Sequence, residues 1–262
     1  MAAVLPALFD AHLHPEGVSD QDLESLHFFG VTTALVAADH SPIHAKVKSI
    51  LGHFDDIVQR QLPRLEAAGI RAYAALGVHP GALPRRGLTE VLSALPSYFR
   101  GGKVVALGEV GLHLGGEAEE EAFLGQVELA RKLKLALLVH TPSKDKERLT
   151  RRTLTLLKAS LIPPAQVLVD HASPRTVRLI LACGYHAGLT VHPEELSAEQ
   201  TVALVRKLGA ERLLLDSDSG DGAGDLLGMA RAASLLAKAG LSERVVARVG
   251  FDNAAEFFKI AN

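Results

Sequence analysis

The chain has 262 residues, of which 48% are hydrophobic and 22% charged, and its formal net charge is −2. This composition is ordinary for a globular enzyme, and the nearly balanced charge argues against a strong general attraction to nucleic acid. Its one cysteine excludes an internal disulfide, and no uncharged apolar run is long enough to span a membrane. The composition suits a reducing compartment, so we expect the protein in the cytoplasm. The length allows one large domain, which we expect to cover residues 1–262.

Short apolar runs alternate with helical patterns along the chain. Strands are predicted at residues 4–9, 31–37, 71–78, 103–107, 135–139, 167–169, 186–191 and 212–215. Helices are predicted at residues 20–29, 44–68 with an interruption near Pro63, 88–100, 117–132, 145–159, 175–182, 198–208, 226–239, 242–249 and 253–260. Strands this apolar are typical of parallel sheets buried on both faces, so the pattern predicts an α/β fold, the (β/α)8 TIM barrel. A doubly wound open sheet is the alternative, but no glycine-rich dinucleotide turn follows the first strand.

The first strand is predicted to end in the stretch Asp10-Ala-His12-Leu-His14. Side chains two residues apart on a strand share a face, so His12 and His14 should point the same way. Each neutral imidazole offers a lone pair at a fixed angle, which suits a metal ion better than a hydrophobic core.

Ionisable side chains recur at the predicted strand ends. They are His12, His14, His79, Glu109, His140, His171, Asp216 and Asp218. A barrel builds its active site at the carboxyl ends of its strands, so this set predicts a metal site there. The donors exceed the three protein ligands of one catalytic zinc, and a carboxylate can bridge two ions. We expect two divalent metal ions, with zinc as the first expectation and manganese, iron, nickel or magnesium as alternatives.

The chain resembles the TatD-like metal-dependent hydrolases, a family of amidohydrolase-type barrels, over nearly its whole length. The resemblance rests on Phe-Asp10-Ala-His12-Leu-His14, Leu-Gly-Val-His79-Pro, Ala-Leu-Gly-Glu109-Val-Gly-Leu, Leu-Val-His140-Thr, Val-Asp-His171, Leu-Asp216-Ser-Asp218-Ser and Asp252-Asn-Ala-Ala-Glu-Phe-Phe. It implies that His12 and His14 bind one metal ion, that His140 and His171 bind the second, that Glu109 bridges them, that Asp218 lies near the first, and that His79 faces the substrate.

Two departures from the family pattern concern the substrate. Gly81 stands where the family often has a histidine, and His113 stands where it often has an aspartate. The segments 142–153 and 188–193 are similar to a less characterised TatD-related branch. The roles of His113, His192 and Asp216 are left open by the sequence.

The function expected is that of a divalent-metal-dependent hydrolase that attacks a phosphoester with a metal-bound hydroxide, as some deoxyribonucleases of this family do. The catalytic residues would be Asp218 as the proton acceptor, Glu109 and His79. An amidohydrolase or lactonase acting on a carboxylic ester or amide is one alternative. A metal-binding protein without turnover is another. The expected substrate is a small or nucleic-acid-derived anion, with no membrane involved and no oligomeric state predicted.

Asp216 and Asp218 compete for the role of metal ligand. If the last strand is regular, Asp216 lies roughly 6–7 Å deeper in the barrel, where an unpaired charge is costly. We therefore expect Asp218 to be the ligand and Asp216 to be a supporting carboxylate.

Basic residues follow several predicted strands. We expect at least one of them to contact an anionic group of the substrate. They are Arg85, Arg86, Lys144, Lys146, Arg148, Arg151, Arg152 and Arg175.

Overall fold

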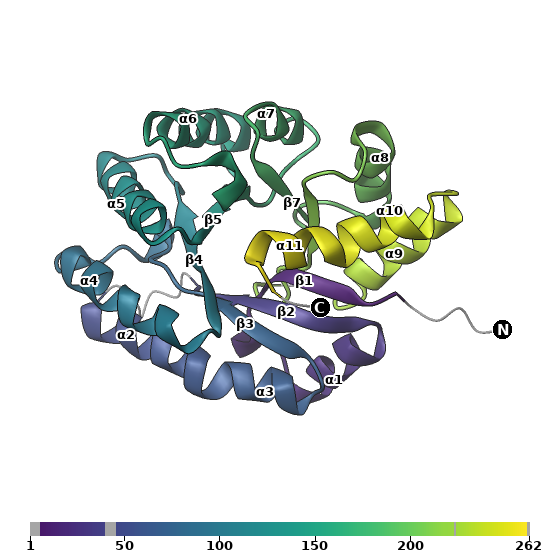
Figure 1. Ribbon diagram of the computed structural model, residues 1–262, viewed down its shortest axis with the longest axis horizontal. Helices are drawn as coiled ribbons and strands as arrows, with labels where there is room; N and C mark the ends of the chain where they lie inside the picture. Colours follow the sequence, from purple (N-terminus) through teal and green to yellow (C-terminus); the bar gives the residue numbers. More distant parts are fainter. Residues whose placement is uncertain (1–5, 40–45, 223, 261–262) are drawn as a thin grey trace.

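The computed structural model describes residues 6–39, 46–222 and 224–260. One parallel sheet of eight strands follows the order of the chain, each strand pairing with the next (Figure 1). The strands are β1 (Leu8–Leu13), β2 (Val31–Ala37), β3 (Arg71–Ala75), β4 (Val104–Gly111), β5 (Ala136–His140), β6 (Val167–Val169), β7 (His186–Thr190) and β8 (Leu213–Asp216). The predicted (β/α)8 barrel is confirmed.

Helices surround the sheet on its outer side, except for the last one, which lies across one end of the barrel (Figure 1). They are α1 (Asp20–Phe28), α2 (Val47–Asp56), α3 (Leu62–Ala67), α4 (Leu88–Tyr98), α5 (Glu117–Leu133), α6 (Lys146–Ala159), α7 (Val177–Ala182), α8 (Ala198–Leu208), α9 (Gly228–Lys238), α10 (Glu243–Ala247) and α11 (Asn253–Phe258). Local signals set their ends. Ser197 begins α8 because its hydroxyl accepts the Gln200 N–H at 3.2 Å while the Gln200 side chain accepts the Ser197 N–H at 2.9 Å.

The barrel closes between β1 and the segment that follows β8. Leu13 pairs with Ser219, and the backbone N–H groups of His14 and Asp218 donate to Ser219 and His12 at 2.8 and 3.0 Å. Gly220 has φ +102°, and a Cβ there would overlap the carbonyl of His14, so only glycine fits. This closure places the residues after β8 beside the two histidines of β1.

Aromatic residues fill the other end of the barrel. The Phe9 ring lies 5.9 Å from the rings of Phe251 and Phe258, and α11 packs on the interior residues of the strands. Burying one such ring contributes about 2–3 kcal/mol. The polar site therefore lies at the opposite, carboxyl end.

Several predicted elements differ in their bounds from those observed. The first strand covers Leu8–Leu13 rather than residues 4–9, of which 4 and 5 lie outside the described residues, so His12 lies inside β1. The fourth strand covers Val104–Gly111 rather than residues 103–107, so Glu109 lies inside β4. The third strand ends at Ala75 rather than at residue 78. The helix predicted at 44–68, of which 44 and 45 lie outside the described residues, is divided by a π-helical turn at Ile57–Gln61, just before Pro63, which lacks an N–H to donate.

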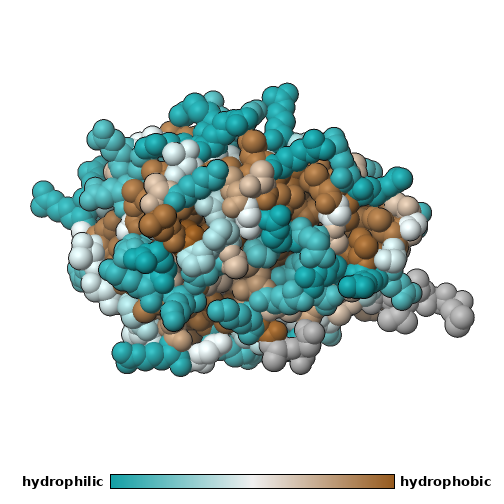
Figure 2. Space-filling model, turned by 45° about the horizontal axis from the view of Figure 1, so that its top comes forward, coloured by the Kyte–Doolittle hydropathy of each residue, from teal (hydrophilic) through white to brown (hydrophobic). Residues whose placement is uncertain are grey.

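The surface drawn in Figure 2 carries hydrophobic side chains in separate patches between hydrophilic ones. Within residues 6–39, 46–222 and 224–260, no helix combines the length and apolar character that crossing a bilayer requires.

Candidate metal centre

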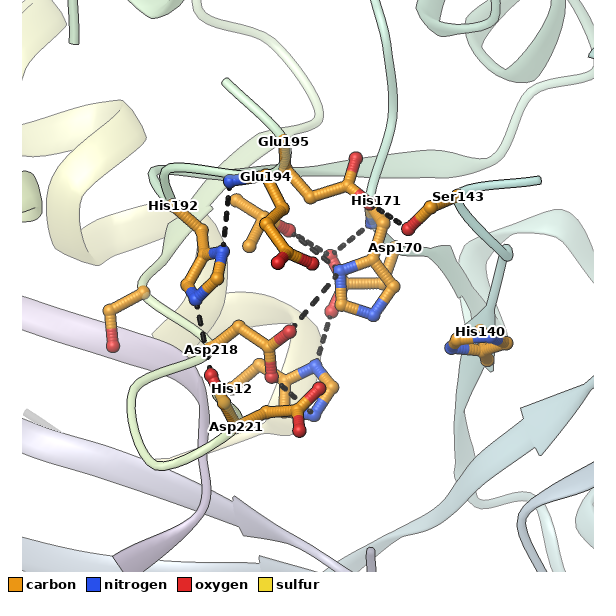
Figure 3. Close-up of polar contacts among 12 residues, drawn as sticks. His12, His140, Ser143, Asp170, His171, His192, Glu194, Glu195, Asp218 and Asp221 are labelled. Carbon is orange, nitrogen blue, oxygen red and sulfur yellow. Dashed lines mark hydrogen bonds and ion pairs between the residues drawn. The ribbon is translucent and has the colours of Figure 1, made fainter. Parts of the chain in front are cut away.

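A cavity of about 130 Å³ opens among the carboxyl ends of the strands. Most predicted site residues line it, and they come from six different strands or the segments that follow them. The lining residues are His14, His79, Glu109, His113, His140, Pro142, Ser143, His171, Asp218 and Asp221. Figure 3 shows Asp218 beside His12 and His171, with His140 across the site.

His12 and His14 face each other through their Nε2 atoms, 3.0 Å apart. The Nδ1–H of His12 donates to Asp170 at 2.7 Å, and that of His14 donates to the carbonyl of Ala37 at 3.1 Å. Both Nε2 atoms of the neutral rings therefore present lone pairs to the same point. Two lone pairs this close repel each other unless a cation or a proton lies between them, so the pair fits a metal ion.

Glu109 lies between two groups of histidines. Its Oε1 is 2.8 Å from Nδ1 of His140 and 3.1 Å from Nε2 of His171. Its Oε2 is 3.6 Å from Nε2 of His12 and 3.8 Å from Nε2 of His79. Each oxygen of one carboxylate thus faces a different set of imidazoles, as a bridging ligand requires.

Asp218 approaches the pair on β1. Its Oδ1 lies 3.2 Å from Nε2 of His14 and 3.7 Å from Nε2 of His12, and this buried oxygen has no hydrogen-bond donor. The strand has ended at Asp216, and Asp218 itself has φ +50°. The regular strand assumed for the depth argument is therefore wrong, because the left-handed residue turns the chain toward β1.

His79 presents a proton rather than a lone pair. Its Nδ1 accepts the backbone N–H of Gly81 at 2.9 Å, so the neutral ring carries its hydrogen on Nε2. That atom faces Oε2 of Glu109, where it can donate to an anionic oxygen.

Burial and opposite charges shift the pKa values strongly. Burial lowers the pKa of His12, but the carboxylates of Glu109 and Asp218 outweigh it and raise this pKa well above its usual range. Burial also opposes charge on His171, whose pKa Asp170 and Glu109 nevertheless raise to about 9. Burial raises the pKa of Glu109 and of Asp218, yet neighbouring imidazoles hold both well below their usual range. The site therefore carries fixed negative charge that attracts cations.

Within the described residues, three groups of donors lie close enough together to hold a metal ion. One joins His12, His14 and Glu109, and another joins His79, Glu109 and His140. The third, His12 with Asp170, His171 and Asp216, lies deeper. Imidazole nitrogens and carboxylate oxygens suit zinc and similar divalent ions, so the residues present fit a metal centre.

Asp170 supports the site in a way that sequence reasoning missed. Its Oδ2 accepts from His12, and its Oδ1 accepts the backbone N–H of His171 at 2.8 Å. Thr190 on β7 lies 3.0 Å from Nδ1 of His171, which directs Nε2 of that ring toward Glu109. Gly188 leaves room for the Asp170 carboxylate, since a Cβ there would overlap it. The only sequence signal was an aspartate directly before His171.

Lys146 also supports His171. Its Nζ donates to the carbonyl of His171 at 2.7 Å and to Glu195 at 2.6 Å. The Ser143 hydroxyl donates to the same carboxylate at 3.2 Å (Figure 3). This network ties the segments after β5 and β7 together across the mouth. Lys146 therefore makes internal contacts instead of the substrate contact considered for it.

The residues whose roles were open divide among three positions. Asp216 is fully buried, and neither of its side-chain oxygens has a hydrogen-bond partner. His192 holds two loops together: its Nδ1 accepts the Glu194 N–H at 3.2 Å, and its Nε2 donates to the carbonyl of Asp221 at 3.2 Å (Figure 3). His113 lines the cavity.

Comparisons with known proteins find similarity over nearly the whole chain. The family model described as "TatD related DNase" matches residues 9–259. An uncharacterized metal-dependent hydrolase from Methanocaldococcus jannaschii is 31% identical over 97% of this chain and 100% of its own length. A TatD-like protein from Archaeoglobus fulgidus has a crystal structure that superposes with a TM-score of 0.82 at 28% identity, covering 96% of this chain and 100% of its own. A lactonase from Listeria monocytogenes, 14% identical with a TM-score of 0.66 over 98% of this chain and 95% of its own, shares the fold.

Proposed function

Because the chain belongs to the TatD-related family of metal-dependent hydrolases, we propose that it hydrolyses a phosphoester with two divalent cations at the carboxyl end of its barrel. The observation that carries the proposal is the position of Glu109. One of its oxygens faces His140 and His171, and the other faces His12. A carboxylate shared in this way is typical of two-metal sites, which phosphatases and nucleases use.

The cations are assigned to two sets of residues. His12 and His14 would hold the first, His140 and His171 would hold the second, and Glu109 would serve both. When bound, such cations lower the pKa of a water molecule and neutralise charge on the reacting phosphoryl group. Zinc suits this mixture of nitrogen and oxygen donors.

The chain's own side chains handle protons and position. Asp218 lies beside the first pair of histidines, with a buried oxygen that has no donor, so it accepts the proton of the attacking water and passes it to the leaving group. The Nε2–H of His79 donates to an oxygen of the substrate.

The test is a substrate panel on metal-loaded protein. Phosphomonoesters, bis(4-nitrophenyl) phosphate and oligonucleotides are compared with lactones and N-acyl amides, with Glu109→Gln as the matched variant. We expect turnover of a phosphoester, and at least 100-fold less with the variant. Turnover of lactones or amides without any phosphoester would contradict the proposal, as would full metal loading without turnover of any compound.

A further inference from the structure

The imidazole of His113 lies beside the candidate metal ligands but belongs to none of their groups. His113 follows β4, lines the cavity and is exposed. Its ring centroid lies 5.9 Å from that of His140, nearly parallel at 27°, and 6.2 Å from that of His79. It is absent from the three groups of possible metal donors found among the described residues. Its nitrogens therefore lie where a substrate can reach them.

A buried carboxylate fixes the segment that carries His113. Glu119 in α5 accepts the backbone N–H of His113 at 2.7 Å, of Leu114 at 3.0 Å and of Gly115 at 2.8 Å. Glu119 is only 9% exposed, so these bonds are shielded from water. Gly115 has φ +82°, and a Cβ there would lie 2.6 Å from the Leu149 side chain. One side chain thus holds three consecutive amides and presents His113 in one position.

Cationic side chains are missing from the same cavity. None of its described lining residues is lysine or arginine. Four of the basic residues after β5 are paired with carboxylates instead: Lys146 with Glu195 at 2.6 Å, Arg148 with Asp145 at 3.0 Å, Arg151 with Glu147 at 2.8 Å and Arg152 with Glu120 at 2.5 Å. A nucleic-acid strand is held by a cationic groove and by aromatic faces on which its bases stack. The cavity has neither, and its 130 Å³ is small against the roughly 300–1,000 Å³ of pockets for drug-sized ligands.

We propose that His113, held in place by Glu119, is a specificity residue that donates a hydrogen bond to a small phosphate ester, and that this ester, not a nucleic-acid strand, is the substrate. The proposal rests on the proposed function. His79 and His113 line the cavity and are not among the histidines assigned to the two cations under the proposed function, and both can donate to phosphate oxygens. Two such donors suffice for one phosphoryl group whose remaining charge the cations neutralise, whereas a polyanion would need further positive charge.

The test compares His113→Phe with the wild type after both are loaded with zinc and their metal content is measured. The substrates are bis(4-nitrophenyl) phosphate and a single-stranded oligothymidylate, and binding of inorganic phosphate is measured by calorimetry. His27→Phe, on the exposed surface of α1, is the matched control. Glu119→Gln tests the positioning role, because its amide keeps one acceptor oxygen but loses the charge.

We expect His113→Phe to keep its metal and to bind phosphate at least 10-fold more weakly, since a hydrogen bond to a charged group contributes about 1.5–3 kcal/mol. KM for the small diester should rise by a similar factor. The KM and phosphate affinity of Glu119→Gln should lie between those of wild type and His113→Phe, and both values of the His27→Phe control should match those of wild type. The wild type should prefer the small diester over the oligonucleotide in kcat/KM.

Two results overturn the inference while leaving the proposed function intact. One is turnover of the small diester with KM and phosphate binding in His113→Phe within twofold of wild type. The other is a preference of the wild type for the oligonucleotide. Metal-loaded wild type that cleaves no phosphoester overturns the proposed function, and this inference with it.

Discussion

Asp170→Asn should weaken metal binding although Asp170 is not assigned as a ligand. In the wild type, Oδ2 accepts from Nδ1–H of His12 and Oδ1 accepts the backbone N–H of His171. An amide can accept at only one of these positions. If its oxygen stays near His171, its NH2 group meets Nδ1–H of His12, and the ring must move its hydrogen to Nε2. If the amide flips, its NH2 group faces the backbone N–H instead.

The size of the effect follows from the quality of the lost contact. Replacing a residue that orients a metal-bound histidine costs 10- to 100-fold in affinity, which is about 1.4–2.7 kcal/mol. The Asp170–His12 bond is short, at 2.7 Å, and Asp170 is 1% exposed, so the effect should lie near the upper end. Competition with a chromophoric chelator on metal-stripped protein should show one of two binding steps weakened, the one that involves His12 and His14.

Asp216→Asn is the matched control. Burial and repulsion from Asp170 raise the pKa of Asp216 well above its usual range, and an amide has nearly the same shape as this carboxyl group. Because Asp216 is not assigned to either set of metal-binding residues, the metal affinity of Asp216→Asn should stay near that of wild type. Unchanged zinc affinity in Asp170→Asn, or an equal loss in both variants, would refute the reasoning.

Three further outcomes are expected. Asp218→Asn should lower kcat by about 100-fold or more at saturating metal, the effect of losing a general base; turnover near that of wild type would rule out this role. Lys146→Met should lower the free energy of unfolding in urea by about 2–3 kcal/mol, because it leaves the Glu195 carboxylate, 11% exposed, without its cationic partner. Arg148→Met removes an exposed ion pair and should change this free energy by less than about 1 kcal/mol. Equal effects of the two substitutions would contradict this reasoning. Burial lowers the pKa of half-buried His186 to about 4, so its contribution to stability is complete above pH 6.5 and is lost as pH falls toward 4. The free energy of unfolding of His186→Phe should therefore fall by about 1–2 kcal/mol less than that of wild type between pH 6.5 and pH 4, after allowance for solvent screening. An equal fall in the two proteins would contradict this.

Local patterns predicted most of the fold. Val31–Ala37, Val167–Val169 and Ala198–Leu208 have the predicted bounds because apolar runs, glycine stops and a serine cap act within a few residues. The first strand was misplaced because its position depends on pairing with β2 and on the link between Leu13 and Ser219. Such contacts join distant segments and leave no local signal.

The site divides in the same way. Parallel strands bring their carboxyl ends together, so the histidines and carboxylates after them could be predicted to meet. The support from Asp170, Thr190 and Lys146 could not be predicted, because each acts through hydrogen bonds to residues distant in the sequence. Nor could Glu119, whose acceptor role depends on the path of the three residues after β4.

The central claim is that two cations shared by Glu109 are needed for phosphoester hydrolysis. It is tested most directly by adding Mn²⁺ in steps to metal-free protein while electron paramagnetic resonance and hydrolysis of bis(4-nitrophenyl) phosphate are followed on the same samples. We expect hydrolysis to rise with the second equivalent, together with the spectrum of a magnetically coupled Mn²⁺ pair, and Glu109→Gln to lose both. Full hydrolysis after one equivalent, or a coupled pair that hydrolyses nothing, would contradict the claim.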